Sequence, residues 1–342
     1  MSGLLFRKSR VGIDLGSANT VIYIEKKGIA LREPSIVAVD RSTKQPISFG
    51  LDAANLMGKT NKEIEIIYPI KHGLVDNITL LKPMLSFFIK KALSKRTPQS
   101  EIVIGVPSAA SKISQKALLD TLKGLNIHRA MILEAPYAVA LGAKLPIDQP
   151  KGHLVVDIGS SVTDIGVLSY NDMVYSQTLP IGGDLFDQYI QEAVRRHYNM
   201  IISRSVAQEL KNNIGYAELS ASDDKQIYLA SGQQSNNFLP MQRNVQSLII
   251  FRAIEPIILQ IIAGIQTVLE KIPPELIVDI SETGLCLAGG TAMLKRLPKR
   301  LEKELNIPVN EVDYPMDVLA LGTGYVLDDL QRQIKKVERL RR

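Results

Sequence analysis

Two short polar segments, each lying between apolar runs, carry the residues of this chain best suited to bind phosphate and its metal. They read VGIDLGSANTVIYI over Val11–Ile24 and LVVDIGSSVTDIGVL over Leu154–Leu168. Each has an apolar run, an Asp-x-Gly-Ser turn and a second apolar run, which is the pattern of a β-hairpin. Backbone N–H groups in such a turn can bind phosphate oxygens, and an aspartate at the end of the first strand can hold Mg²⁺ through water.

The two segments repeat one another at the spacing of a whole domain. Four residues of the first recur 143 positions later in the second: Asp14, Gly16, Ser17 and Thr20 match Asp157, Gly159, Ser160 and Thr163. One Asp-x-Gly-Ser turn alone is common in ordinary hairpins, but an internal repeat is far more specific. The repeat predicts two related domains whose hairpins hold one polyphosphate and its metal.

Length and composition indicate a globular protein of two domains. The 342 residues are 45% hydrophobic and 22% charged, which are globular values. The single cysteine, Cys286, lies in an apolar run, which predicts a buried thiol, excludes an intramolecular disulfide and, with no visible secretory signal, indicates a cytoplasmic location. The most apolar stretch, Gln246–Ile272, contains Arg252 and Glu255, so we expect a core helix there instead of a membrane span.

The net charge of +6 comes from the two ends of the chain. Residues 1–10 carry three basic residues and no acid, and residues 331–342 carry six basic residues against Glu338, which leaves the body between them slightly acidic. This balance argues against a nucleic-acid-binding body. The two basic ends are suited to an anionic membrane surface, and simple solvation of both ends is the alternative.

Strands that alternate with helices place the chain in the α/β class. The spacing of apolar residues predicts helices over Leu80–Leu93, Ser111–Leu122, Tyr137–Leu145, Asp184–His197, Ser205–Ile214, Gln246–Ile272, Pro298–Leu305 and Asp317–Arg342. Buried strands are expected at Glu101–Val106 and Ala130–Glu134, further strands at Gly284–Gly290 and Pro308–Val312, and strands and loops over residues 220–245.

The paired hairpins resemble the actin-like ATPase superfamily, and within it the sequence resembles the MreB family of bacterial actins over nearly the whole chain. The matching segments are Asp14–Thr20 (DLGTANT in the family), Glu33–Ala38 (in NEPSVVA), Leu133–Pro146 (EEPMAAAIGAGLP), Asp157–Asp164 (DIGGGTTE), Ile181–Asp184 (VGGD), Glu270–Asp279 (in LEKTPPELAAD), Leu287–Leu294 (LTGGGALL) and Ala320–Gly324 (ALGTG).

This resemblance implies an actin-like, duplicated ribonuclease-H-like fold with two domains and four subdomains. The implied bounds are domain I at 1–150 with 315–342 returning to it, and domain II at 151–314. Within them the subdomains are IA at 1–32 and 66–150, IB at 33–65, IIA at 151–180 and 245–314, and IIB at 181–244.

The resemblance also implies that the chain binds ATP or ADP with Mg²⁺, and it assigns residues to each part of the ligand. Asp14 and Asp157 would hold Mg²⁺, largely through water. The implied nucleotide contacts are Ser17, Ala18 and Asn19 in phosphate loop one; Gly159, Ser160, Ser161 and Val162 in phosphate loop two; Gln208, Glu209, Leu210 and Lys211 at the ribose and base; and Gly289, Gly290, Thr291, Ala292 and Met293 against the adenosine. A simple glycine turn and a solvated helix face are the alternatives for the last two groups.

Two positions depart from the family's motifs where a group that orients the attacking water is implied. Glutamate normally precedes the proline of EEP, but Ala135 stands there, and Glu134 lies one residue earlier, about 100° away around a helix. The first threonine of GGGTTE is Val162, which has no hydroxyl. Because loss of such groups typically lowers rates by about 10²–10⁴, we expect weak hydrolysis unless Glu134 or another group substitutes.

The function implied is that of a filament-forming cytoskeletal protein that controls cell shape, or shape-based motility in a wall-less cell. Self-assembly into antiparallel double protofilaments, contact with other MreB paralogues and a place at the inner face of the cell membrane are implied as well, with no role for nucleic acid. A small-molecule kinase or phosphotransferase of the same superfamily is the alternative, although no catalytic acid is visible. The four histidines are scattered, which argues against a zinc site.

Overall fold

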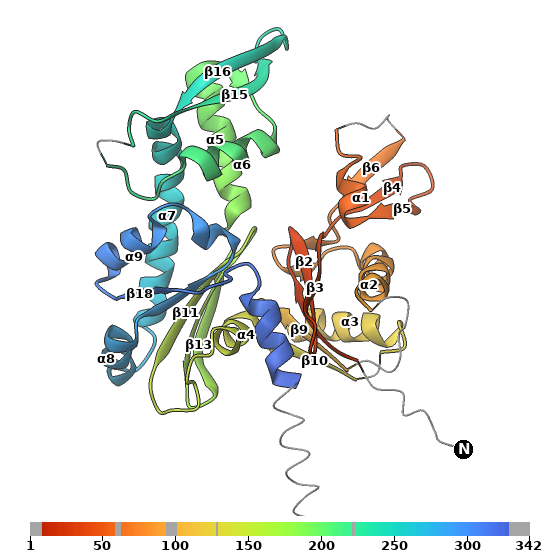
Figure 1. Ribbon diagram of the computed structural model, residues 1–342, viewed down its shortest axis with the longest axis vertical. Helices are drawn as coiled ribbons and strands as arrows, with labels where there is room; N and C mark the ends of the chain where they lie inside the picture. The colour runs from red at the N-terminus through yellow and green to blue at the C-terminus, as the bar shows by residue number, and fades with distance from the viewer. Residues whose placement is uncertain (1–8, 59–62, 94–100, 128, 221–222, 328–342) are drawn as a thin grey trace, which may run out of the picture. The chain divides into compact units, whose positions relative to one another are not determined.

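The computed structural model describes residues 9–58, 63–93, 101–127, 129–220 and 223–327, shown in Figure 1. The described residues form two compact units. The first runs to Ile147 and takes in the described residues from Met316 onward, and the second is Asp148–Pro315. Each unit is built around its own five-stranded sheet.

The sheet of the first unit has the strand order β10-β9-β1-β2-β3. Its strands are β1 Arg10–Leu15, β2 Asn19–Ile24, β3 Gly28–Pro34, β9 Glu101–Val106 and β10 Arg129–Glu134. Strands β1 and β2 form an antiparallel hairpin in which Asp14 pairs with Val21, and β9 lies parallel to β1 on its other side. The first predicted hairpin is therefore confirmed, with Asp14 close to the end of β1.

The sheet of the second unit repeats this topology, in the order β18-β17-β11-β12-β13. Its strands are β11 His153–Ile158, β12 Thr163–Ser169, β13 Asp172–Leu179, β17 Leu285–Ala288 and β18 Val309–Glu311. Strand β11 pairs antiparallel with β12 and parallel with β17, as β1 does with β2 and β9. The internal repeat of the sequence is therefore a duplicated sheet.

Helices pack on both faces of the first unit's sheet. Strand β1 presents large apolar residues to the helices on one face and a glycine to the helix on the other. The helices are α2 Ile78–Ala92, α3 Lys112–Lys123, α4 Ala135–Gly142 and Val318–Leu327. Val11 and Ile13 belong to the apolar core that α2 and α3 complete. On the other face a Cβ at Gly12 would lie 2.5 Å from Thr323 Oγ1, so glycine there lets helix Val318–Leu327 approach the sheet closely.

Smaller elements complete the first unit. A three-stranded sheet in the order β5-β4-β6 and a two-stranded sheet of β7 and β8 lie between β3 and α2 in the sequence. Their bounds, with the short helix that follows β5, are β4 Val37–Asp40, β5 Pro46–Phe49, α1 Gly50–Ala54, β6 Ile64–Ile67, β7 Ile70–Lys71 and β8 Leu74–Val75.

The second unit has one long central helix, α7, with other helices packed around it. Its elements beyond the main sheet are α5 Gly183–Tyr198, β14 Met200–Ile201, α6 Arg204–Ile214, β15 Ile227–Gln234, β16 Pro240–Gln246, α7 Ser247–Leu269, α8 Pro274–Thr283, the 3-10 helix Gly290–Met293 and α9 Leu297–Leu305. Strands β14, β15 and β16 form a separate three-stranded sheet.

Helix α7 is the one helix in the described part of the chain that is long and apolar enough to cross a membrane by length and composition. Its residues at helical spacing, among them Ile254, Ile261 and Ile265, are completely buried in the core of the second unit. Helix α7 packs against α5, α6, α9, β12 and β13. These contacts agree with the prediction that Gln246–Ile272, which Arg252 and Glu255 interrupt, forms a core helix and not a membrane span.

Several sequence expectations change in the structure. Strand β10 is not buried, because it is the edge strand of its sheet and Arg129 and Met131 are exposed. Helices α1 and α8 had no counterpart among the expected elements. The predicted helix Asp317–Arg342 is described only over Val318–Leu327, and its basic end lies outside the described residues.

Candidate functional site

The turn of the first hairpin is held from two directions. Ser35 Oγ donates to Gly16 O at 2.7 Å and lies 2.8 Å from Thr20 Oγ1, and the Ser35 N–H donates to Ala18 O at 2.9 Å. The Gly73 N–H donates to Ser17 Oγ at 2.9 Å. The turn that carries Ser17, Ala18 and Asn19 is therefore fixed before any ligand arrives, although neither Ser35 nor Gly73 was among the expected site residues.

The turn of the second hairpin is fixed by hydrogen bonds to its carbonyl groups. The Gly183 N–H donates to Gly159 O at 3.1 Å, and the Asp184 N–H donates to Ser160 O at 2.6 Å. Thr291 Oγ1 donates to Gly159 O at 2.8 Å. The N-terminus of α5 and the expected adenosine segment 290–293 therefore both contact the expected phosphate loop within the second unit.

Glycine at position 182 allows the start of α5 to pack closely against the second turn. A Cβ at Gly182 would lie 2.6 Å from the backbone of both Ser160 and Ser161, closer than real Cβ atoms approach. Any other residue there would push the turn and the start of α5 apart. The glycine at position 182 therefore lets the start of α5 pack directly on the turn at Ser160 and Ser161.

Asp14 lies in one cross-strand row with a basic residue. Asp14 pairs with Val21, and Val21 pairs with Arg32 on β3, so all three side chains project from the same face of the sheet. Arg32 forms an ion pair with Asp317 on this face. Burial raises the pKa of Asp14 to about 7, with the Arg32 charge acting in the opposite direction. A desolvated carboxyl at a strand end is suited to a bound cation.

Asp157 occupies the equivalent place in the second unit, and Gly289 lies directly against it. A Cβ at Gly289 would lie 2.5 Å from Asp157 Oδ1, and the φ angle of Gly289 is +91°, a conformation that L side chains rarely adopt. The turn after β17 can approach Asp157 this closely because it carries glycine. Across the described residues no group of three or more His, Cys, Asp or Glu side chains could hold a metal, so Mg²⁺ here would keep most of its ligands as water or phosphate, as it commonly does.

The expected ribose and base residues lie on α6. Glu209 Oε2 accepts a hydrogen bond from Tyr228 OH at 3.3 Å. Lys211 Nζ donates to Gly183 O at 3.1 Å and pairs with Asp187 Oδ1 at 2.6 Å. Met293, at the end of the adenosine segment, leaves 62% of its surface exposed. The apolar Met293 surface is therefore accessible, while the Lys211 ammonium group is already held by α5.

The two positions that lack water-orienting groups, Ala135 and Val162, lie at the start of α4 and in the turn of the second hairpin. Ala135 is the first residue of α4 and is 2% exposed. Glu134 ends β10 and precedes α4, and its side chain does not cap the helix. Val162 lies in the turn, where its carbonyl accepts the Gly159 N–H at 2.9 Å. Neither Ala135 nor Val162 can orient water through its side chain.

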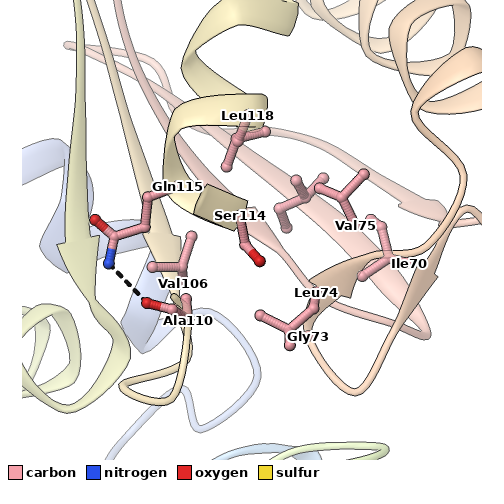
Figure 2. A pocket seen from close by; sticks show the side chains of 10 residues that line it. Ile70, Gly73, Leu74, Val75, Val106, Ala110, Ser114, Gln115 and Leu118 are labelled. Carbon is pink, nitrogen blue, oxygen red and sulfur yellow. Dashed lines mark hydrogen bonds between the residues drawn. The ribbon is translucent and has the colours of Figure 1, made fainter. Parts of the chain in front are cut away.

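An apolar pocket lies behind the first hairpin, within the first unit. It is lined by side chains that include Leu15, Val106 and Ser114, together with Gly73, and Gln115 closes one side by donating from Nε2 to Ala110 O at 2.9 Å. Figure 2 shows Gly73, Val106 and Ser114 around the pocket, with the hydrogen bond from Gln115 to Ala110 drawn. Its walls are mostly apolar, so the pocket does not suit a phosphate group.

The duplicated sheets, each with a polar hairpin turn and a strand-end aspartate, define an actin-like fold. Solved structures agree: the structure of MreB5 of Spiroplasma citri bound to ADP matches with a TM-score of 0.90 and 25% identity, covering 96% of this chain and 98% of that one. A MamK double helical filament matches with a TM-score of 0.78 at 21% identity over 94% of this chain and 99% of that one, which bears on the fold alone.

The chain belongs to the MreB/Mbl protein family, whose model matches residues 8–335. The cell shape-determining protein MreB of Escherichia coli (strain K12) is 36% identical over 324 residues, which is 93% of each chain. The cell shape-determining protein Mbl of Bacillus subtilis (strain 168) is 33% identical over 327 residues, covering 95% of this chain and 98% of that protein.

Proposed function

We propose that the chain is a nucleotide-dependent, filament-forming cytoskeletal protein that controls cell shape, or shape-based motility in a wall-less cell. The observation that carries this proposal is the pair of equivalent hairpins, whose turns are fixed by Ser35 and Gly73 in one unit and by Gly183, Asp184 and Thr291 in the other. Similarity to an ADP-bound MreB5 and to the cell shape-determining proteins MreB and Mbl supports it.

Adenine nucleotide and Mg²⁺ are the proposed ligands. Asp14 and Asp157 would hold the metal, largely through water, and the backbone of the two turns would bind phosphate oxygens. Lys211 and Glu209 would lie at the base and ribose, with segment 289–293 against the adenosine. Mg²⁺ supplies charge neutralisation of the phosphates when bound.

Hydrolysis by this chain is proposed to be weak. Ala135 offers no carboxylate and Val162 offers no hydroxyl where the family's motifs carry glutamate and threonine. A positioned base or acid typically contributes about 10²–10⁴ in rate. Nucleotide binding would then regulate assembly more strongly than nucleotide turnover does.

The domain bounds, filament architecture and cellular location implied by the resemblance are part of this proposal. In this proposal subdomain IB would contain most of the β5-β4-β6 sheet with α1, and subdomain IIB would contain α5, α6 and most of the β14-β15-β16 sheet. Antiparallel double protofilaments, contacts with MreB paralogues and a cytoplasmic position at the membrane, through residues 1–10 and 331–342, complete it.

Electron microscopy with a coupled phosphate-release assay tests the proposed function against a kinase of the same superfamily. The protein incubated with Mg-ATP should form filaments, and its phosphate release should stay slow. A protein that stays monomeric at all concentrations and transfers phosphate to a small molecule would contradict the proposal.

A further inference from the structure

A buried aspartate of the second unit is held by two cations from α6. Asp187 leaves 1% of its side chain exposed. Its Oδ1 lies 2.6 Å from Lys211 Nζ and its Oδ2 lies 3.4 Å from Arg204 Nε. Arg204 also pairs with Asp184 in the first turn of α5. Because a buried charge without a partner is strongly destabilising, these ion pairs tie α6 to the start of α5.

The same ammonium group reaches the end of α5 that contacts the second hairpin. Lys211 Nζ donates to Gly183 O at 3.1 Å, while the Gly183 N–H donates to Gly159 O and the Asp184 N–H donates to Ser160 O. A continuous path of polar contacts therefore runs from α6, through the first turn of α5, to the loop at Gly159 and Ser160.

The packing around Gly183 leaves no room for a larger side chain. A Cβ at this position would lie 2.8 Å from Thr291 Oγ1 and 3.4 Å from Lys211 Nζ. The first turn of α5, the Lys211 ammonium and segment 290–293 thus meet at one glycine. Since Thr291 Oγ1 also donates to Gly159 O at 2.8 Å, all three segments are held at fixed spacing from the loop.

We propose that Asp187 is a positioning residue for the nucleotide: through Lys211 it fixes the distance between α6, at the adenosine end, and the loop at Gly159, at the phosphate end. The inference rests on the proposed nucleotide binding. Asp187 itself is buried and does not contact the ligand. Its effect is preorganisation, because two ends of one ligand gain affinity together only when their binding segments are held at the right separation.

Competition binding with whole and divided ligands tests this inference. Mg-ADP, pyrophosphate and adenosine are compared on the wild-type protein, Asp187→Asn and Lys211→Met. Glu192→Gln is the control, because Glu192 lies on the same helix and pairs with exposed Arg195 and Arg196 at the surface. We expect both variants to weaken Mg-ADP about 10-fold, the lower end for lost supporting contacts, with pyrophosphate changed less than about 2-fold. Adenosine should change less than about 2-fold in Asp187→Asn, and in Lys211→Met, which also removes a proposed base contact, it should weaken less than Mg-ADP does.

Lys211→Met keeps the test decisive if Asp187→Asn does not fold, because Asp187 then retains Arg204 as its partner. Unchanged Mg-ADP affinity in the folded variants would overturn the inference and leave the proposed function intact. Equal weakening of all three ligands would also overturn it, because that result indicates general damage to the binding site. A loss of adenosine binding as large as the loss of ADP binding would overturn it as well, because that result indicates only a direct contact with the base. Folded wild-type protein that binds no ADP would refute the proposed function, and the inference with it.

Discussion

The backbone N–H of Gly73 donates a hydrogen bond of 2.9 Å to Ser17 Oγ, which joins the first hairpin turn to a residue 56 positions later. Gly73 has a φ angle of +69°, and a Cβ there would lie 2.2 Å from Pro107 Cγ. The glycine is thus required both by its conformation and by close packing on Pro107. Ser17, an expected phosphate contact, is positioned by a backbone group that local sequence does not reveal.

Ser17→Ala should weaken Mg-ADP binding about 10-fold and lower the free energy of unfolding by about 1 kcal/mol, because it removes a proposed phosphate contact and leaves the Gly73 N–H without this acceptor. The melting temperature of the ligand-free protein should fall by about 2–4 °C. Thermal shift with and without Mg-ADP measures both effects. Ser281→Ala, which removes an exposed hydroxyl bonded only locally to Val278 O, is the control. Equal shifts for the two variants would contradict the assigned role of Ser17.

Restoring the two absent groups should accelerate turnover. The double variant Ala135→Glu, Val162→Thr is expected to raise phosphate release at least about 10-fold if the new carboxylate reaches the water. Ala135 is 2% exposed, so the glutamate must displace neighbours, and folding is checked by thermal melting. Glu134→Gln is the matched variant one residue away. If Glu134→Gln alone abolishes a wild-type rate equal to that of relatives with glutamate and threonine, Glu134 does the work and the weak-hydrolysis proposal is wrong.

Cys286 should be nearly inert in the native protein. Burial, with a smaller contribution from the Asp157 charge, raises the pKa of this thiol from 9.0 to about 12, so its thiolate fraction at pH 8 is about 10³-fold lower than in the unfolded chain. Because the folded pKa lies above the unfolded one, the contribution to stability is complete below pH 9 and is lost as pH rises toward 12. Alkylation rates in buffer and in guanidinium measure this. Equal rates would show an accessible thiol.

The basic ends of the chain should make membrane binding depend on lipid charge. Residues 331–342 and 1–10 carry nine basic residues against one acid, and each contributes about 1 kcal/mol near an anionic surface. We expect pelleting with anionic liposomes, none with neutral ones, and release by salt. A chain lacking residues 1–7 and 331–342 should stay in the supernatant. If it pellets like the full chain, the ends are only solvated.

The repeat and the apolar patterns of the sequence were enough to predict much of the fold. The two hairpins follow directly from matching turns, and α7 follows from isoleucines at helical spacing, despite Pro256 inside it. Periodicity could not reveal that β10 is an edge strand, because an apolar run gives no information about its neighbours. Helix α8 begins at the second proline of Pro273-Pro274, which is compatible with a helix start but equally marks the end of α7.

The supporting residues of the site were harder to predict than its loops. The Asp-x-Gly-Ser turns follow from short-range pattern, whereas Ser35, Gly73 and Asp187 act across long stretches of chain. The partners of Asp187 lie 17 and 24 positions away, a spacing that helix geometry within one element does not explain. Only the packing of α6 on α5 brings these groups together, so tertiary structure was needed to find them.

Calorimetric titration of the full chain with ADP, in Mg²⁺ and in EDTA, measures the proposed nucleotide binding directly. The wild-type protein should bind ADP at one site more tightly with Mg²⁺, and Asp14→Ala and Asp157→Ala should each reduce that gain about 10-fold by removing a carboxylate proposed to hold the metal. Asp120→Ala, which removes an exposed carboxylate paired with Lys123, should bind like the wild type. Well-folded wild-type protein that binds neither ADP nor ATP in Mg²⁺ would show that the paired hairpins do not form a nucleotide site.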